Sequence, residues 1–207
     1  MQVPSIRLVV HGRDDEESPL YFSMCRKHFI ESEKAIAEFN TMSPISGFLS
    51  KPPKQVLKML AVLTKINEHQ YISIVFGVMC LEAFIFDYSA HYLGDPYTKE
   101  NLDKLKLIQK YLVIPRIVTG KDFPKEGQAF EHLKKLVKAR NDLVHYRSKP
   151  QHTDFELLEE RWKEREECRN PFNTVVEVLT ELKKLDDTAE WWKLQETGTI
   201  LTTRKTN

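Results

Sequence analysis

Hydrophobic residues recur at the spacing of an α-helix through most of the chain. One expected helix carries apolar residues at helical spacing, namely Val56, Leu57, Leu60 and Leu63. From Tyr71 to Phe86 nearly every position is apolar, which is typical of a helix surrounded by other helices. A strand is excluded for this segment because strands rarely exceed about ten residues. The pattern predicts an all-α fold, an antiparallel helical bundle with additional N- and C-terminal helices.

Capping and helix-breaking residues set the expected boundaries of these helices. The helices are expected from Ser18 to about Phe39, from Pro53 onward, from Tyr71 to near Gly94, from Thr98 onward with interruptions at Pro115 and Gly120, from 128 to 146, from 155 to 167 and from 171 to 185. Ser18, Thr98 and Asn170 are predicted N-caps, because short polar side chains accept hydrogen bonds from the free N–H groups at a helix start.

Length and composition predict one folded domain spanning residues 1–207. With 41% hydrophobic and 29% charged residues the chain is typical of a globular protein. Residues 6–10 are expected to form a short strand or a docked arm, and Trp191 and Trp192 to anchor the C-terminal segment. No secretory signal is visible. The apolar stretch 71–86 contains Glu82 and is shorter than the roughly 20 residues that cross a bilayer. We therefore expect a cytoplasmic protein with no membrane partner.

Cysteine and histidine usage predicts neither a disulfide scaffold nor a metal centre. The three cysteines are far apart, as in proteins of a reducing cytosol: Cys25, Cys80 and Cys168. Cys25 and His28 have the spacing of two ligands on one helical turn, but no second pair completes a zinc site. Four histidines show no pattern in the sequence: His11, His28, His69 and His152. No cofactor and no metal are expected.

Charge is distributed unevenly, although the net charge is only +1. Residues 99–149 contain 13 Lys and Arg against 6 Asp and Glu, whereas residues 154–190 contain 6 against 12. This asymmetry fits a basic face that meets an acidic ligand; it also fits two solvated helix faces. The charge count alone leaves both interpretations open.

Arg140 interrupts the apolar face of the helix expected at 128–146. It follows Leu133 and Val137 at a position where a leucine is expected. A guanidinium cannot lose its charge, so burying it without a partner costs several kcal/mol or more. Glu82 is the only charge between Tyr71 and Phe86. The sequence therefore predicts that Arg140 meets Glu82, a second subunit or an anionic ligand; a plain buried ion pair that only fixes packing is the alternative.

The segment from Arg140 to His145, with the sequence RNDLVH, carries a family resemblance. It resembles the motif of HEPN domains, α-helical bundles in which an arginine and a polar residue precede a histidine. The upstream sequence MCLEAFIFDY at 79–88 is similar to the buried helix of bacterial members. The likeness covers about residues 55–148, and about 154–195 is expected to be a C-terminal helical extension.

The resemblance implies a metal-independent endoribonuclease that uses the ribose 2′-hydroxyl as internal nucleophile, as a toxin or antiviral-defence effector. His145 would act as general acid or base, Arg140 would stabilise the phosphorane, and Asn141 would orient the phosphate or His145. Glu82 is expected to orient Arg140. It further implies a homodimer with a composite site and RNA as ligand rather than DNA, and it allows an antitoxin protein as a further partner. The residues expected to contact RNA are basic or aromatic: Lys134, Lys138, Tyr146, Arg147 and Lys149.

Two other function classes remain open at the level of sequence. One is a non-catalytic HEPN-like module that binds a nucleotide or a protein, such as a nucleotidyltransferase or an antitoxin. The other is a structural bundle whose acidic C-terminal helices mediate assembly. The presence of Arg140, Asn141 and His145 together favours the nuclease.

Overall fold

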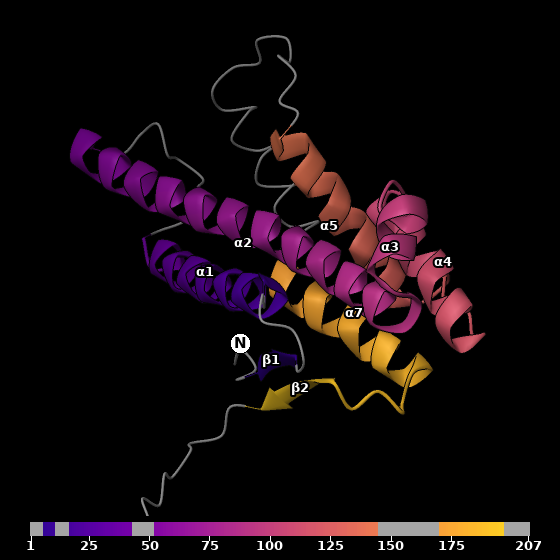
Figure 1. Ribbon diagram of the computed structural model, residues 1–207. Helices are drawn as coiled ribbons and strands as arrows, with labels where there is room; N and C mark the ends of the chain where they lie inside the picture. Colours follow the sequence, from indigo (N-terminus) through magenta and orange to yellow (C-terminus); the bar gives the residue numbers. More distant parts are fainter. Residues whose placement is uncertain (1–5, 11–16, 43–51, 145–169, 197–207) are drawn as a thin grey trace, which may run out of the picture.

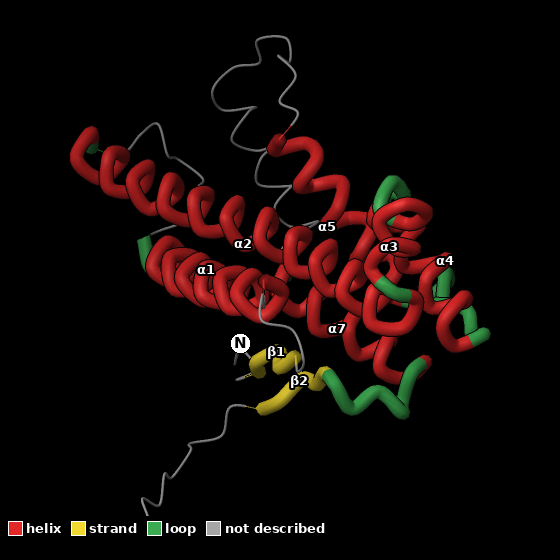
Figure 2. Tube along the Cα trace, in the orientation of Figure 1, coloured by secondary structure: helices red, strands yellow, loops and turns green. Residues whose placement is uncertain are grey.

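The computed structural model describes residues 6–10, 17–42, 52–144 and 170–196, and most of them are helical (Figures 1 and 2). The elements in chain order are β1 (Ile6–Val10), α1 (Glu17–Asn40), α2 (Pro53–Leu93), α3 (Asp95–Tyr97), the π-helix η2 (Thr98–Leu102), α4 (Leu107–Thr119), α5 (Gln128–Val144), α7 (Pro171–Leu185) and β2 (Trp192–Glu196). The all-α character predicted from the hydrophobic pattern is confirmed, apart from one short pair of strands.

Residues 53–93 form one helix, α2, where the sequence analysis predicted two. The intervening residues 64–70 contain neither glycine nor proline, so nothing breaks the backbone hydrogen bonds. Buried residues also continue without interruption through this stretch, at Ile66, Gln70 and Ser73. The change from amphipathic to fully apolar pattern therefore reflects a change in what surrounds the helix. Gly94, with φ 84°, ends α2 at the expected place.

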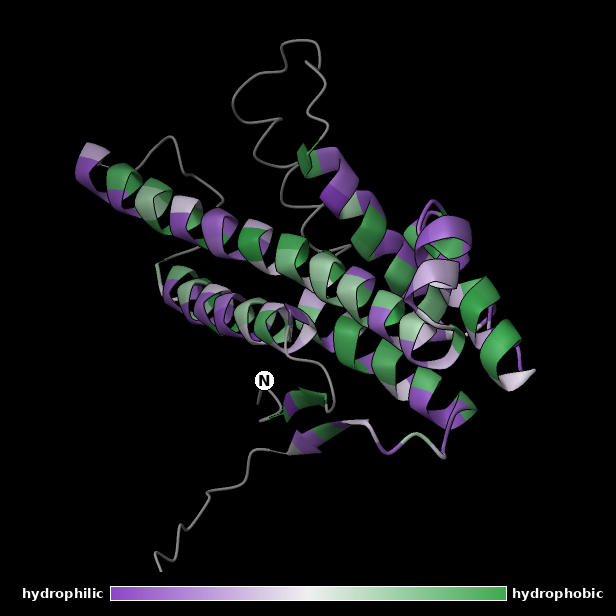
Figure 3. Ribbon diagram, in the orientation of Figure 1, coloured by the Kyte–Doolittle hydropathy of each residue, from purple (hydrophilic) through white to green (hydrophobic). Residues whose placement is uncertain are grey.

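Helix α2 is the centre of the bundle and packs against α1, α4, α5 and α7 (Figure 1). At Gly77 the neighbours come close: a Cβ there would lie 3.3 Å from the Cys25 sulfur and 3.4 Å from Cγ2 of Val175. The absence of a side chain at this position lets α1 and α7 approach the same turn of α2. Hydrophilic and hydrophobic residues alternate along α1 and α5, as expected for helices with one buried face (Figure 3).

The first part of α2 and the last part of α1 extend beyond the remaining helices (Figure 1). They have a separate small core made of Ala35, Ile36, Phe39, Met59, Val62, Leu63 and Ile66. We call residues 35–40 and 53–66 the arm. The main core holds the other buried residues of α1 and α2 together with those of α4, α5 and α7.

The connection between α2 and α4 differs from the prediction. Thr98 is not an N-cap: it is buried in η2, where its hydroxyl lies 2.9 Å from the Ser89 hydroxyl. Pro115 does not interrupt α4 but lies within it, because its missing N–H affects only one hydrogen bond near the helix end. Gly120, with φ 73°, terminates α4. The short helical turns and η2 thereby bring α4 back against α2.

Strands β1 and β2 pair antiparallel, with Ile6 opposite Glu196 and Val10 opposite Trp192. The strand alternative for residues 6–10 is therefore confirmed. Trp192 is buried and its ring meets Phe84 of α2 edge to face, so it anchors the C-terminal segment as expected. The expected C-terminal extension is helical only in part, because β2 follows α7.

Other boundaries are close to those expected. Helix α1 begins at Glu17, so Ser18 lies inside the helix rather than capping it. Helix α7 occupies the predicted residues, and Asn170 has the N-cap position without a capping hydrogen bond from its side chain. The helix predicted at 155–167 and the end of the helix predicted to reach residue 146 lie outside the described residues.

By length and composition α2 is long and apolar enough to cross a membrane, so the length argument made for residues 71–86 is wrong. In the structure, 56% of its most apolar window is buried inside the protein. The core helix of a soluble protein passes the same length and composition test, so one such helix is weak evidence for a membrane span.

Candidate functional site

Arg140 lies on the inward side of α5, two turns after Leu133 and one turn after Leu136, both of which are fully buried. Its side chain is 25% exposed, so it is held at the edge of the core rather than in open solvent. Its Nε is buried and has no hydrogen-bond partner among the residues that the structure describes. A cation in this position retains unsatisfied hydrogen-bonding capacity.

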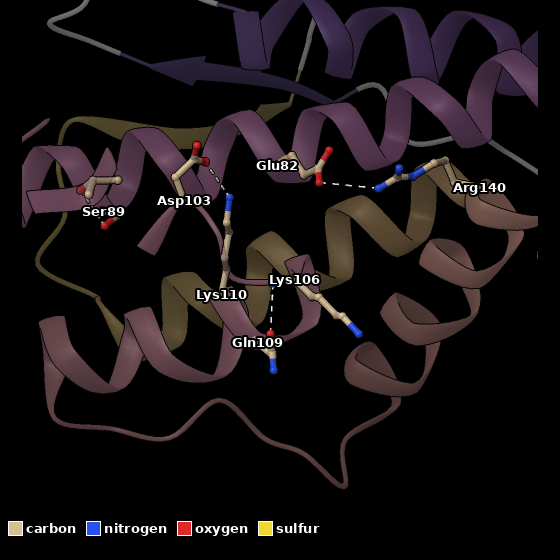
Figure 4. Close-up of polar contacts among 8 residues, drawn as sticks. Glu82, Ser89, Asp103, Lys106, Gln109, Lys110 and Arg140 are labelled. Atoms are coloured by element: carbon tan, nitrogen blue, oxygen red, sulfur yellow. Dashed lines mark hydrogen bonds and ion pairs between the residues drawn. The ribbon is translucent and has the colours of Figure 1, made fainter. Parts of the chain in front are cut away.

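The expected ion pair between Arg140 and Glu82 is present. Nη2 of Arg140 lies 3.6 Å from Oε1 of Glu82, which projects from the facing side of α2 (Figure 4). This separation exceeds that of a hydrogen bond. Because both side chains are partly solvated, at 25% and 44% exposed, the pair contributes about 0–1 kcal/mol to stability. The pairing is too loose to occupy the guanidinium fully.

A pocket of about 810 Å³ opens beside this pair, between α2, the start of α4 and the last turns of α5. Its wall includes Glu82, Arg140 and Asn141 together with residues of the η2–α4 connection and α4. The structure thus brings three of the predicted site residues to one cavity. Asn141 is exposed and follows Arg140 directly on α5.

Lys110 of α4 lines the same pocket and was missed by the sequence analysis. Its Nζ donates to Oδ1 of Asp103 at 3.1 Å, and its side chain is only 9% exposed (Figure 4). The signal was present in the sequence: Lys110 stands between Leu107 and Ile114 on the buried face of α4, as Arg140 does on α5.

The start of α4 adds further positive potential to the pocket. Leu107, Ile108 and Gln109, whose N–H groups are at the helix start, all line the cavity. The partial positive charge of a helix N-terminus favours an anion there. Lys106 also lines the cavity and forms no ion pair with any residue that the structure describes. Three cationic side chains and one helix start therefore face two carboxylates, Glu82 and Asp103, so the pocket retains capacity for an anionic group.

Two residues predicted to contact RNA, Lys134 and Lys138, do not line this pocket. Lys134 pairs with Glu131 at 2.5 Å and lies 5.4 Å from the centre of the Phe130 ring. Lys138 is exposed on α5. The remaining predicted residues of the site lie outside the described part of the chain: His145, Tyr146, Arg147 and Lys149.

His28 and His69 show no pattern in the sequence, but the structure brings them together. The Nδ1 atoms of these two residues, on α1 and α2, lie 3.0 Å apart. Desolvation lowers the pKa of His28 below its usual value, and the neighbouring His69 lowers it further by a smaller amount. The sequence does not show the pair, because its members are 41 positions apart.

No family model matches the chain, and neither the curated proteins nor the solved structures contain a similar one.

Proposed function

We propose that this protein is a metal-independent endoribonuclease of the HEPN type, with its phosphate-binding site at the pocket between α2, α4 and α5. The observation that carries the proposal is Arg140, a permanent cation on the buried side of α5. Its Nε has no hydrogen-bond partner within the described part of the chain, and its contact with Glu82 is loose. The Arg140 side chain is 25% exposed at the pocket wall, and its Nη groups are the donors that a phosphodiester oxygen in the pocket would accept from.

In this reaction the 2′-oxygen of the ribose attacks the adjacent phosphorus, and the bond to the 5′-oxygen breaks. His145 takes the proton of the 2′-hydroxyl or gives one to the leaving 5′-oxygen, a contribution of about 10²–10⁴-fold in rate. Arg140 stabilises the charge on the phosphorane, Asn141 orients the phosphate, and Glu82 orients Arg140. Two copies of the chain supply the two proton-transfer groups if the site is composite. The product is a 2′,3′-cyclic phosphate.

The experiment is incubation of the purified chain with total RNA in the presence of EDTA, followed by analysis of the product ends. Arg140→Gln and His145→Ala are expected to lose cleavage while keeping the circular dichroism spectrum of the wild type. Lys58→Gln, which removes an exposed lysine from the arm, is the matched control and is expected to cleave normally. Cleavage that persists in His145→Ala removes the proposed acid–base role.

A second candidate function is binding of a nucleotide without cleavage. The specific observation in its favour is the pocket itself, whose volume of about 810 Å³ lies within the usual range of small-molecule sites. Titration calorimetry with mono- and dinucleotides separates the two functions: tight binding that depends on Arg140, with no cleavage of any RNA, favours the binding module. In cells, growth arrest on expression of the wild type but not of His145→Ala supports a toxin or defence role.

A further inference from the structure

His28 and His69 form a cross-helix pair next to the arm. His28 lies on α1, and His69 lies three residues after Ile66, the last arm residue of α2. The two Nδ1 atoms are 3.0 Å apart, and the ring centres are 5.1 Å apart with the planes inclined at 48°. Neither ring is fully buried, so the pair is sheltered by the two helices and open to small solutes.

We propose that His28 and His69 form a two-histidine site for a divalent first-row transition metal ion, which links α1 to α2. The site is independent of the pocket at Arg140 and of the proposed function.

The distance between the two nitrogens fits this role. Imidazole nitrogens bind zinc at about 2.0–2.1 Å, so two ligands at a right angle are about 2.9 Å apart and two tetrahedral ligands about 3.4 Å apart. The observed 3.0 Å lies within this interval; without an ion, one Nδ1–H donates a hydrogen bond to the other Nδ1 over this distance, and the metal ion replaces that bond. A small rotation of the rings is then enough to direct both lone pairs at one ion, while the helices stay in place.

The protonation of the pair also favours a metal ion. Coordination requires both imidazoles neutral, with their protons on Nε2. Burial, and after it the neighbouring His69, lower the pKa of His28, which is the direction that favours the neutral ring. The charge of Lys27 also lowers the pKa of His28, whereas the charge of Glu31, one turn after His28, raises it. The carboxylate of Glu31 is held by Lys34 at 2.7 Å.

The ligand set defines which ions are expected and how strongly they bind. Within the described ranges no third His, Cys, Asp or Glu joins the pair to make a ready cluster, so water completes the coordination shell. A site of two imidazoles without thiolate suits Cu²⁺, Ni²⁺ and Zn²⁺, with Cu²⁺ the tightest by the general order of affinities. The site is therefore exchangeable rather than permanently filled.

The test uses the full chain without an affinity tag, stripped of metal by chelation. We expect calorimetry with Cu²⁺, Ni²⁺ or Zn²⁺ at neutral pH to show one site per chain and thermal unfolding to shift upward with the ion. The expected loss in affinity is roughly tenfold or more for His28→Gln and for His69→Gln. His91→Gln is the matched control, because His91 is an exposed histidine of the same helix α2 that stacks on Trp191.

Electron paramagnetic resonance of the wild-type chain with one equivalent of Cu²⁺ gives a readout that does not depend on how the variants fold. Coupling to two imidazole nitrogens supports the site. Coupling to none, or affinity unchanged in both glutamine variants, overturns it. Removal of the metal is expected to leave RNA cleavage unchanged, so a failure here is distinct from a failure of the proposed nuclease.

Discussion

The hydroxyl of Tyr88 donates a hydrogen bond of 2.9 Å to Oδ2 of Asp186, 98 residues further along the chain. Tyr92, one turn later on α2, donates to the same oxygen at 2.7 Å. Asp186 follows the last residue of α7 and is buried, so these contacts fix the end of α7 to α2. Burial and the carboxylate raise the pKa of Tyr88, which keeps its hydroxyl protonated as a donor.

Loss of the carboxylate at Asp186 is expected to destabilise the fold. Asp186→Ala leaves the buried Tyr88 hydroxyl without its acceptor, at a cost of about 1–3 kcal/mol in the free energy of unfolding. Urea denaturation followed by circular dichroism measures the change. Asp187→Ala, at the exposed neighbouring position, is the control and is expected to change stability by less than about 0.5 kcal/mol. Equal effects of the two substitutions would show that the hydrogen bonds contribute nothing.

A proline at position 68 tests the continuity of α2. Glu68 is exposed in the middle of this helix, so Glu68→Pro removes one backbone hydrogen bond and clashes with the preceding turn. We expect a loss of about 3 kcal/mol or more in the free energy of unfolding. Glu68→Ala controls for the side chain and is expected to be neutral or slightly stabilising. Tolerance of proline here would mean that two helices meet at this point, as the sequence first indicated.

The Lys110–Asp103 pair predicts an asymmetric response to substitution. Asp103→Ala leaves a nearly buried ammonium without its counter-charge and is expected to cost about 1–3 kcal/mol. Lys110→Met replaces the cation with an apolar chain of similar length, so the expected change is within about 1 kcal/mol. Thermal unfolding of both variants and of the double variant gives the coupling energy. A larger loss in Lys110→Met than in Asp103→Ala contradicts this account.

Acidification is expected to weaken the α1–α2 contact through His28. The pKa of His28 is lower in the folded chain than its ordinary value, so the folded state disfavours the charged ring. The unfolded chain then binds more protons in the window below about pH 6.5, and stability falls as the pH drops through it. His28→Gln is expected to flatten this part of the pH profile of urea midpoints, whereas His91→Gln keeps the wild-type slope. An unchanged slope in His28→Gln would assign the dependence to other groups.

The features that follow from local pattern were predictable from the sequence. Gly94 and Pro171 mark helix ends because a positive φ and a missing N–H act on the chain directly. The sequence predicts Glu82 as one of the candidate partners of Arg140, because each is a charge that interrupts an apolar face, and the structure places the two side chains 3.6 Å apart. Such interruptions are costly, so they point to each other even when 58 positions separate them.

The features that depend on packing were not predictable. The sequence does not show that α2 is continuous. Its first part packs in the arm and its later part in the main core, so the hydrophobic pattern changes although the helical backbone is uninterrupted. Thr98 has the residue type of an N-cap, yet its hydroxyl turns inward to Ser89, since η2 is buried against α2. The histidine pair and the pocket wall at Lys106 result from the approach of separate helices, and no periodicity records that approach.

The pairing of β1 with β2 places Ile6 directly beside Glu196. A linker of a few residues is therefore enough to join these two positions, and the chain can be circularly permuted by placing new termini in a loop elsewhere. Residues 124–126 are exposed in the loop between α4 and α5 and are a suitable new opening, whereas Phe123 of the same loop is buried in the main core. Such a permuted chain is expected to keep the packing of the helices. Its β1 and β2 become neighbours in sequence, so their pairing no longer joins segments from opposite ends of the chain.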